Sequence, residues 1–185
     1  PGCLCPSCRR GMEELGLDIT NKMDLRKYAL MVERKFLKRM EHLVHSIQPE
    51  ATIFYNGQVN LNLRSKKQYF THIEIESLAT AQWGYHHFPF FVRFCRTLFD
   101  EVIGMTARFH KSWADFGGIK TEAQLEYECA TMLAGCAKCS VGDQLHPRGK
   151  LNTAAYELIG KVYRRVAEKE PWCEGAEPYT QAAIL

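Results

Sequence analysis

Apolar residues recur at intervals of three and four between Asp24 and Ile47, and basic residues occupy mainly the positions between them. This spacing predicts an amphipathic helix that Asp24 caps and Pro49 ends. Its apolar positions are Leu25, Tyr28, Ala29, Val32, Phe36, Met40, Leu43, Val44 and Ile47. We expect the basic face of this helix to be a solvated surface.

Four shorter runs, rich in β-branched and aromatic residues, are typical of buried strands. They cover residues 51–57, 71–78, 101–109 and 138–141. Helical patterns alternate with them, over residues 86–99, 121–135 and 152–169. The second of these helices opens on a sequence in which the side chains of Thr121 and Gln124 are expected to form a capping box.

Helices and strands alternate along the chain without a hairpin signal between any two strands. This order predicts an α/β fold with a parallel sheet and crossover helices. Four strands would form half of an eight-stranded barrel of about 250 residues, or else part of an open sheet. The chain begins at Pro1 and ends on an apolar run, so we expect it to be a piece of a longer protein.

Composition removes some classes of partner. The 185 residues are 46% hydrophobic, which suits a globular core, and carry a net charge of +3, which is too small to indicate nucleic acid. No apolar run approaches a membrane span, so we expect no membrane partner. Three of the eight cysteines, Cys3, Cys5 and Cys8, lie within six residues. Such a cluster favours thiolates around a metal and a reducing compartment, so we expect a cytoplasmic location.

The second predicted strand, over residues 71–78, carries acidic residues on one face. Alternation along residues 71–78 puts His72, Glu74 and Glu76 on one face, while Ile73 and Ile75 lie on the other. Glu76 is nearest the carboxyl end of this strand and is therefore the best candidate for an acid or base. The alternative is that Glu74 and Glu76 pair structurally with basic residues in the interior.

The loops after the next two strands are also rich in polar side chains. Residues 108–118 place Trp113 beside charged donors, which a sugar site needs because the indole offers a flat apolar face. The alternative is a tryptophan packed under its loop. Residues 142–150 contain Asp143, His146 and Arg148. Because parallel strands bring their carboxyl ends to one edge, we expect these loops to share a rim.

Other histidines and cysteines have spacings that metal sites use. His42 with His45, and His86 with His87, are expected at the surface. The two thiols of Cys136-Ala137-Lys138-Cys139 have the gap of a redox or zinc motif, but we expect ordinary thiols because no second pair has the spacing of a zinc ribbon.

Six segments together carry a resemblance to a known family. They are "PGCLCPSC", "EIES", "TARFHKSWADFGG", "LEYE", "GDQLHPRG" and "EPWCEGAEP", in this order. In them the chain resembles the glycosyl hydrolase group that includes the α-L-fucosidases of glycoside hydrolase family 151. It is more distantly similar to the β-galactosidases of family 42. The resemblance covers nearly the whole chain, and "FHKSW" and "GDQLHPRG" are its specific parts.

The resemblance implies a retaining glycosidase on a (β/α)₈ TIM barrel, followed by a trimerisation domain. Residues 1–172 would form the C-terminal half of that barrel, from just after its fourth strand to its eighth helix, and residues 173–185 would begin the next domain or a linker. The implied substrate is a terminal α-L-fucoside, cleaved without a catalytic cofactor by a homotrimer. The alternatives are a β-galactosidase-like hydrolase, an inactive carbohydrate-binding barrel and a cysteine-based metal or redox module.

The resemblance also implies roles for individual residues. Retaining glycosidases use two carboxylates, of which one commonly lies at the end of the fourth strand, so the chain is expected to hold at most one. Glu76 is the prediction and Glu128 of "LEYE" is the reserve, although its predicted position on a helix counts against it. The sugar subsites would be lined by Trp83, Tyr85, His110, Trp113, Asp143, His146 and Arg148.

The cysteine cluster matches a metal site of the family 42 relatives. In these relatives a Cys-x-Cys-x-x-Cys run after the fourth strand supplies three ligands of a structural zinc, with a fourth cysteine upstream. Cys3, Cys5 and Cys8 have this spacing and are the predicted ligands. The fourth ligand would lie before Pro1, and the alternative is a cluster without metal.

Overall fold

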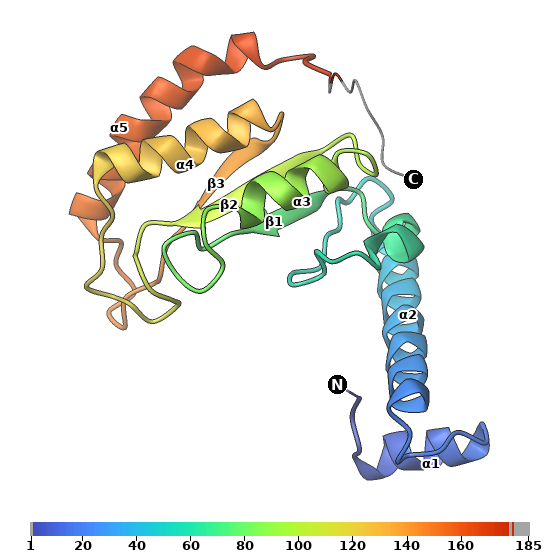
Figure 1. The fold of residues 1–185 in the computed structure, drawn as a ribbon. Coiled ribbons are helices and arrows are strands. Elements are labelled where there is room, and N and C mark those ends of the chain that lie inside the picture. The colour runs from blue at the N-terminus through green and yellow to red at the C-terminus, as the bar shows by residue number, and fades with distance from the viewer. Residues whose placement is uncertain (1, 178, 180–185) are drawn as a thin grey trace. The chain divides into compact units, whose positions relative to one another are not determined.

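The computed structural model describes residues 2–177 and residue 179 (Figure 1). The chain divides into two compact units, one of Pro1–Ile53 with Gln68–Phe70, the other of Phe54–Lys67 with Thr71–Leu185. The predicted boundary at residue 173 does not coincide with the division between these two units. Much of the segment after residue 173 lies outside the described residues. That boundary therefore stays a prediction.

The first unit contains two helices, α1 (Pro6–Glu14) and α2 (Lys22–Ile47). The periodic helix is confirmed as α2, but its cap is not Asp24. The Asn21 side chain accepts a hydrogen bond from the backbone N–H of Met23 at 2.8 Å. Asp24 lies inside the first turn, where its carboxylate accepts from the N–H of Asp18 at 3.0 Å. Helix α1 was not predicted, because its nine residues are too few to show a period.

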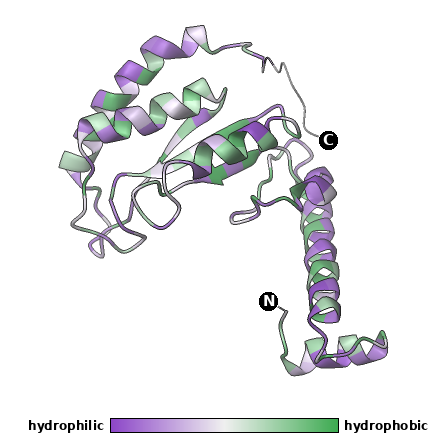
Figure 2. Cartoon of the chain, in the orientation of Figure 1, coloured by the Kyte–Doolittle hydropathy of each residue, from purple (hydrophilic) through white to green (hydrophobic). Residues whose placement is uncertain are grey.

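The apolar stripe of α2 is largely uncovered in this chain. Leu37 is buried, but Phe36 is 53% exposed and Ile47 is 78% exposed. Figure 2 shows hydrophobic and hydrophilic residues interleaved along the whole of α2. Among the described residues, no helix combines the length and the apolarity needed to cross a membrane.

The second unit is an α/β layer built on a parallel sheet. Its strands are β1 (Ile73–Glu76), β2 (Val102–Ala107) and β3 (Lys138–Gly142), in the spatial order β1-β2-β3. Its helices are α3 (His87–Cys95), α4 (Glu122–Ala134) and α5 (Thr153–Lys169). Short 3₁₀ helices, η1 and η2, cover Leu63–Tyr69 and Glu170–Trp172. The predicted α/β class and parallel pairing are confirmed.

The strand predicted at residues 51–57 is wrong. This stretch forms neither strand nor helix, and Thr52 and Phe54 are exposed. A β-branched run becomes a strand only when a neighbouring strand accepts its backbone hydrogen bonds, and within the described residues this stretch pairs with none. Within the described residues, no strand pairs with β1 on the side away from β2, so β1 lies at an edge of the sheet.

Local sequence signals fix the ends of the later helices. At α4, Thr121 accepts from the N–H of Gln124 at 3.3 Å and the Gln124 side chain accepts from the N–H of Thr121 at 3.1 Å. The predicted capping box is therefore confirmed. Helix α5 is capped by Asn152, whose side chain accepts from the N–H of Ala155 at 3.3 Å.

The two faces of the sheet have different surroundings. Ile75, Gly104 and Cys139 are paired in register and share one face. Helices α3 and α4 cover this face, because a Cβ on Gly104 would lie 2.6 Å from atoms of both Phe88 and Met132 (Figure 1).

Helix α5 adds to the same layer. Val162 and Val166 of α5 pack with residues of α4 and with Cys139 and Val141 of β3. All three helices of this unit therefore cover one face. The opposite face carries Glu76, Met105 and Ser140 in register.

The close packing around Gly104 predicts that two glycine-to-alanine substitutions change the stability of the fold in opposite directions. Gly104→Ala should destabilise the fold by about 1–3 kcal/mol, because the added methyl group overpacks the layer between the sheet and its helices. Gly160→Ala on α5 should stabilise it by about 0.5–1 kcal/mol, because its Cβ meets nothing closer than 3.8 Å and alanine favours helix. Chemical denaturation measures both, and equal signs would contradict this packing.

Candidate active site

Glu76 is the last residue of β1 and lies at the carboxyl edge of the sheet. Glu74 shares its face and is half-buried, while Ile73 and Ile75 on the opposite face are fully buried. Loss of water around Glu74 raises the pKa of its carboxyl, and the charge of Glu76 adds to this effect. Within the described residues neither glutamate forms an ion pair.

Trp113 reaches Glu76 from the loop after β2. Its indole Nε1–H donates to Glu76 Oε1 at 2.8 Å. The ring packs edge-on against Phe109, with centroids 5.1 Å apart. A Cβ on Gly142 would lie only 2.8 Å from the far edge of the indole, so the end of β3 leaves room for it. Trp113 is nevertheless 44% exposed, so it is not a tryptophan packed wholly under its loop.

Arg108 links the loop that carries Trp113 to the loop after β3. Its guanidinium Nε donates to Asp143 Oδ1 at 2.6 Å, and its Nη1 donates to the carbonyls of Phe116 and Gly118 at 3.2 and 2.5 Å. Only 1% of this side chain is exposed. The sequence placed Asp143 in the site but did not predict that its partner would be an arginine 35 residues earlier.

The remaining polar residues of the rim lie around this link. The ring of His146 packs against Phe116, with centroids 5.3 Å apart. His110 Nε2 is 3.1 Å from the carbonyl of Ile119, and its own carbonyl accepts from Thr80. Arg148 is exposed on the following turn. The structure thus brings the loops of Trp113, Asp143 and His146 to the edge where Glu76 lies.

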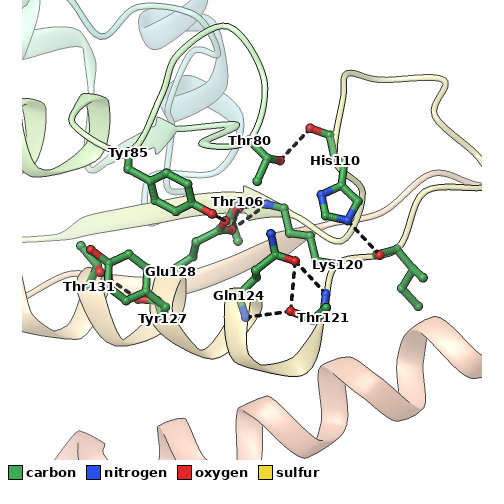
Figure 3. Close-up of polar contacts among 11 residues, drawn as sticks. Thr80, Tyr85, Thr106, His110, Lys120, Thr121, Gln124, Tyr127, Glu128 and Thr131 are labelled. Carbon is green, nitrogen blue, oxygen red and sulfur yellow. Dashed lines mark hydrogen bonds and ion pairs between the residues drawn. The ribbon is translucent and has the colours of Figure 1, made fainter.

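Glu128 has very different surroundings (Figure 3). Its Oε2 is 2.6 Å from Lys120 Nζ and accepts from the Thr106 hydroxyl at 2.5 Å, while its Oε1 accepts from the Tyr85 hydroxyl at 3.2 Å. Lys120 also donates to Thr106 at 2.9 Å. Burial, followed by the negative charge of Glu128, raises the pKa of Tyr85. Both oxygens of this carboxylate are therefore held by partners.

The position of Glu128 also favours a structural role. It lies on α4, and Thr106 is two residues from Gly104, so the contact is on the face that the helices cover. The side chain is buried. The adjoining cavity, lined by Tyr85, Thr106 and Glu128 among others, has a volume of about 20 Å³, which is room for about one water molecule. A sugar ring does not fit there.

Trp83, before α3, and His87, the first residue of α3, have contacts that the sequence did not reveal. Trp83 stacks on His87 at 5.1 Å and packs against the buried cluster around Phe109. His87 Nδ1 is 2.6 Å from the Ser77 hydroxyl, and burial lowers the pKa of His87. Trp83 is thus partly buried, and its role in a sugar subsite stays a prediction. Of His86 and His87, only His86 is exposed as expected.

The other pairs noted in the sequence form no metal group among the described residues. His42 is exposed as expected, whereas His45 is half-buried between Glu41 and the carbonyl of Ala51, and its contact with Glu41 raises its pKa. The Cys139 thiol donates to the carbonyl of Cys129 at 3.3 Å.

Cys3, Cys5 and Cys8 lie at the start of α1 with their sulfur atoms within 4.8 Å of one another. The N–H of Cys8 lowers the pKa of Cys5 to about 7, so this thiol ionises readily. The hydrogen bond between the thiols of Cys5 and Cys8 raises the pKa of Cys8 to about 11. Three converging sulfur atoms fit three corners of a tetrahedral zinc site, which needs a fourth ligand from elsewhere.

Of three comparisons with known proteins, one found a similar protein, an enzyme of solved structure. Models of protein families gave no match, and neither did the sequences of curated proteins. Among solved structures, the chain is similar to an α-L-fucosidase isoenzyme 2 from Paenibacillus thiaminolyticus, with 40% sequence identity and a TM-score of 0.89. The match covers 95% of this chain and 27% of the fucosidase. The predicted resemblance to an α-L-fucosidase is confirmed, although the chain spans about a quarter of that enzyme.

The ion pair at Glu128 generates a stability prediction. Lys120→Met leaves a buried carboxylate without a counter-ion and should destabilise the fold by about 3–5 kcal/mol. The matched control is Glu126→Gln on the same helix, which removes exposed ion pairs to Arg165 and Lys169 and should have little effect. Chemical denaturation compares the two, and similar losses in both variants would contradict the structural role of Glu128.

Proposed function

We propose that the chain is part of a retaining glycoside hydrolase that removes terminal α-L-fucosyl residues. The similarity to an α-L-fucosidase at 40% identity supports the substrate class. The observation in the chain itself that carries the proposal is the contact between Trp113 and Glu76 at the carboxyl edge of a parallel sheet. An apolar ring face beside a carboxylate is the combination that a glycosidase needs to hold a sugar and protonate its linkage.

A TIM barrel is the proposed setting of this site. The three helices cover one face of the sheet, and the other face carries Glu74 and Glu76, as the interior side of a barrel would. The edge of β1 is open to a further strand.

The proposed role of Glu76 is that of acid and base. In a retaining mechanism one carboxyl group protonates the leaving oxygen while a second, about 5–5.5 Å away, attacks the anomeric carbon. We place the second carboxylate outside this chain, because Glu128 is held by Lys120 on the opposite face. The indole N–H of Trp113 fixes one oxygen of Glu76 and leaves the other for the proton.

A structural zinc is proposed at Cys3, Cys5 and Cys8. Their converging sulfur atoms support three ligands, and the fourth would come from outside this chain. Such an ion would hold the loop it binds and would take no part in the hydrolysis. A homotrimer is proposed on the resemblance alone, and a cytoplasmic location on the cysteine cluster, which favours a reducing compartment.

Glu76→Gln in the full-length protein should lower kcat/KM on phenyl α-L-fucoside by about 10²–10⁴-fold, because the leaving phenol then departs without a proton. The loss of kcat/KM should be much smaller on 2,4-dinitrophenyl α-L-fucoside, whose leaving group needs no acid. Glu101→Gln, an exposed glutamate at the opposite end of the sheet, is the control.

Equal losses of kcat/KM in Glu76→Gln on both substrates would contradict the acid role of Glu76. Hydrolysis of aryl β-galactoside in place of the fucoside by the wild type would favour the β-galactosidase-like alternative. Sugar binding without hydrolysis of either substrate would favour an inactive carbohydrate-binding barrel.

Metal analysis tests the zinc proposal. The full-length protein should contain about one zinc ion per chain, since the three thiols and a fourth ligand complete one tetrahedral site. Cys5→Ser should lower this content, while Cys136→Ser, which is outside the group, should leave it unchanged. Zinc-free wild-type protein would mean that the cluster carries no metal.

A further inference from the structure

We propose that Arg108 is a positioning residue, which fixes the loop that carries Trp113 and thereby holds the indole on Glu76. The catalytic consequence rests on the function proposed above, whereas the effect on Trp113 does not. Four observations of this part of the chain carry the inference: the irregular loop, the branched contacts of one guanidinium, its burial and the narrow seat of the indole.

The loop of residues 109–119 has no helix or strand to hold its shape. It is built of successive turns, in which the N–H of Asp115 bonds to Ser112 and the N–H of Phe116 bonds to Ala114. Ala114 adopts a φ of 78°, a left-handed conformation that a residue with a Cβ rarely takes. Such a backbone persists only where surrounding contacts determine it, so the loop needs ties from outside.

Arg108 supplies ties at both ends of this loop. Its own carbonyl accepts from the N–H of Lys120 at 2.7 Å, and its guanidinium Nη1 binds the carbonyls of Phe116 and Gly118. One residue therefore joins the point where the chain leaves β2 to the point where it returns. Trp113 lies in the segment that these contacts close.

The same guanidinium fixes the loop against β3. Its Nε bonds to Asp143, and the backbone N–H of Arg108 bonds to the carbonyl of Gly142 at 3.0 Å. Asp143 also accepts from the N–H of Gln144, whose side-chain oxygen accepts from the N–H of Ala114. A continuous chain of hydrogen bonds thus runs from Arg108 through Asp143 to the residue after Trp113.

Burial makes this arrangement specific to arginine. Arg108 and Asp143 expose 1% and 9% of their side chains, so the charge pair is poorly solvated and its geometry matters. The planar guanidinium can bind Asp143 through one nitrogen and the two carbonyls through another. A lysine at this position keeps the charge but presents a single nitrogen, which cannot reach both sets of partners.

The indole has little freedom at its far end. Gly142 lies against it so closely that a Cβ there would be 2.8 Å away. A small shift of the loop therefore takes the indole N–H away from Glu76 Oε1 or drives the ring into β3. Either movement changes the surroundings of the tryptophan, and that change can be measured directly.

The experiment uses ¹⁹F NMR of the full-length protein labelled with 5-fluorotryptophan, with Trp113→Phe to assign the resonance. Arg108→Gln should shift or split the Trp113 resonance and lower kcat on phenyl α-L-fucoside by about 10–100-fold, a range expected when a positioning contact is lost. Arg108→Lys should give a smaller change of both. The matched control, Arg165→Gln, removes an exposed arginine that also binds carboxylates and should change neither.

The outcomes separate the two proposals. An unchanged Trp113 resonance in Arg108→Gln and Arg108→Lys overturns the positioning role, whatever the activity. If Arg108→Gln shifts the resonance and the wild-type protein has no fucosidase activity, the positioning of Trp113 is supported and only the proposed function is contradicted.

A second variant covers the case in which Arg108→Gln does not fold. Gly142→Ala leaves Arg108 in place and presses on the indole from β3, so it should shift the same resonance and lower kcat. If Gly142→Ala shifts the resonance while Arg108→Lys does not, the loop is held without Arg108 and the proposal is overturned.

Discussion

Parallel pairing in register is the constraint from which the candidate site follows. Because Glu76 pairs with Met105 and Ala107 pairs with Gly142, β1, β2 and β3 end close to one edge of the sheet. The loops that follow each strand must therefore begin beside one another. No residue of the rim is close to Glu76 in sequence, and Trp113 is 37 positions away. The sheet makes them neighbours.

The two sides of this sheet give the same side chain opposite roles. Glu128 lies on α4 against the helix-covered face, where Lys120, Thr106 and Tyr85 use both of its oxygens. Glu76 faces away from the helices and bonds to an indole through one oxygen. A carboxylate that neutralises a buried cation contributes to folding, whereas one with a free oxygen at an accessible rim can exchange a proton with a ligand. Environment, not residue type, separates the two glutamates.

Much of the fold could be predicted from the sequence because its signals are local. The period of α2, the capping box at Thr121 and the alternation in β1 each depend on neighbours a few residues apart. The strand at residues 51–57 could not be settled in this way, because a strand exists only with a partner and pairing is not local. The partners of Arg108 and Glu128 were hidden for the same reason, since they lie 35 and 8 residues away.

The geometry of Trp113 limits what the tryptophan can contribute to a sugar site. Its N–H is already donated to Glu76, so the indole can offer a bound sugar only its apolar face and edge. Hydroxyl groups of that sugar must then find polar partners elsewhere on the rim, and His146 and Arg148 follow the same strand that ends at Gly142. Stacking on an indole recognises most pyranoses alike. Under the proposed function, discrimination between fucose and galactose would therefore fall to polar residues such as those of the loop after β3, and the tryptophan would serve chiefly to hold the ring beside the carboxylate.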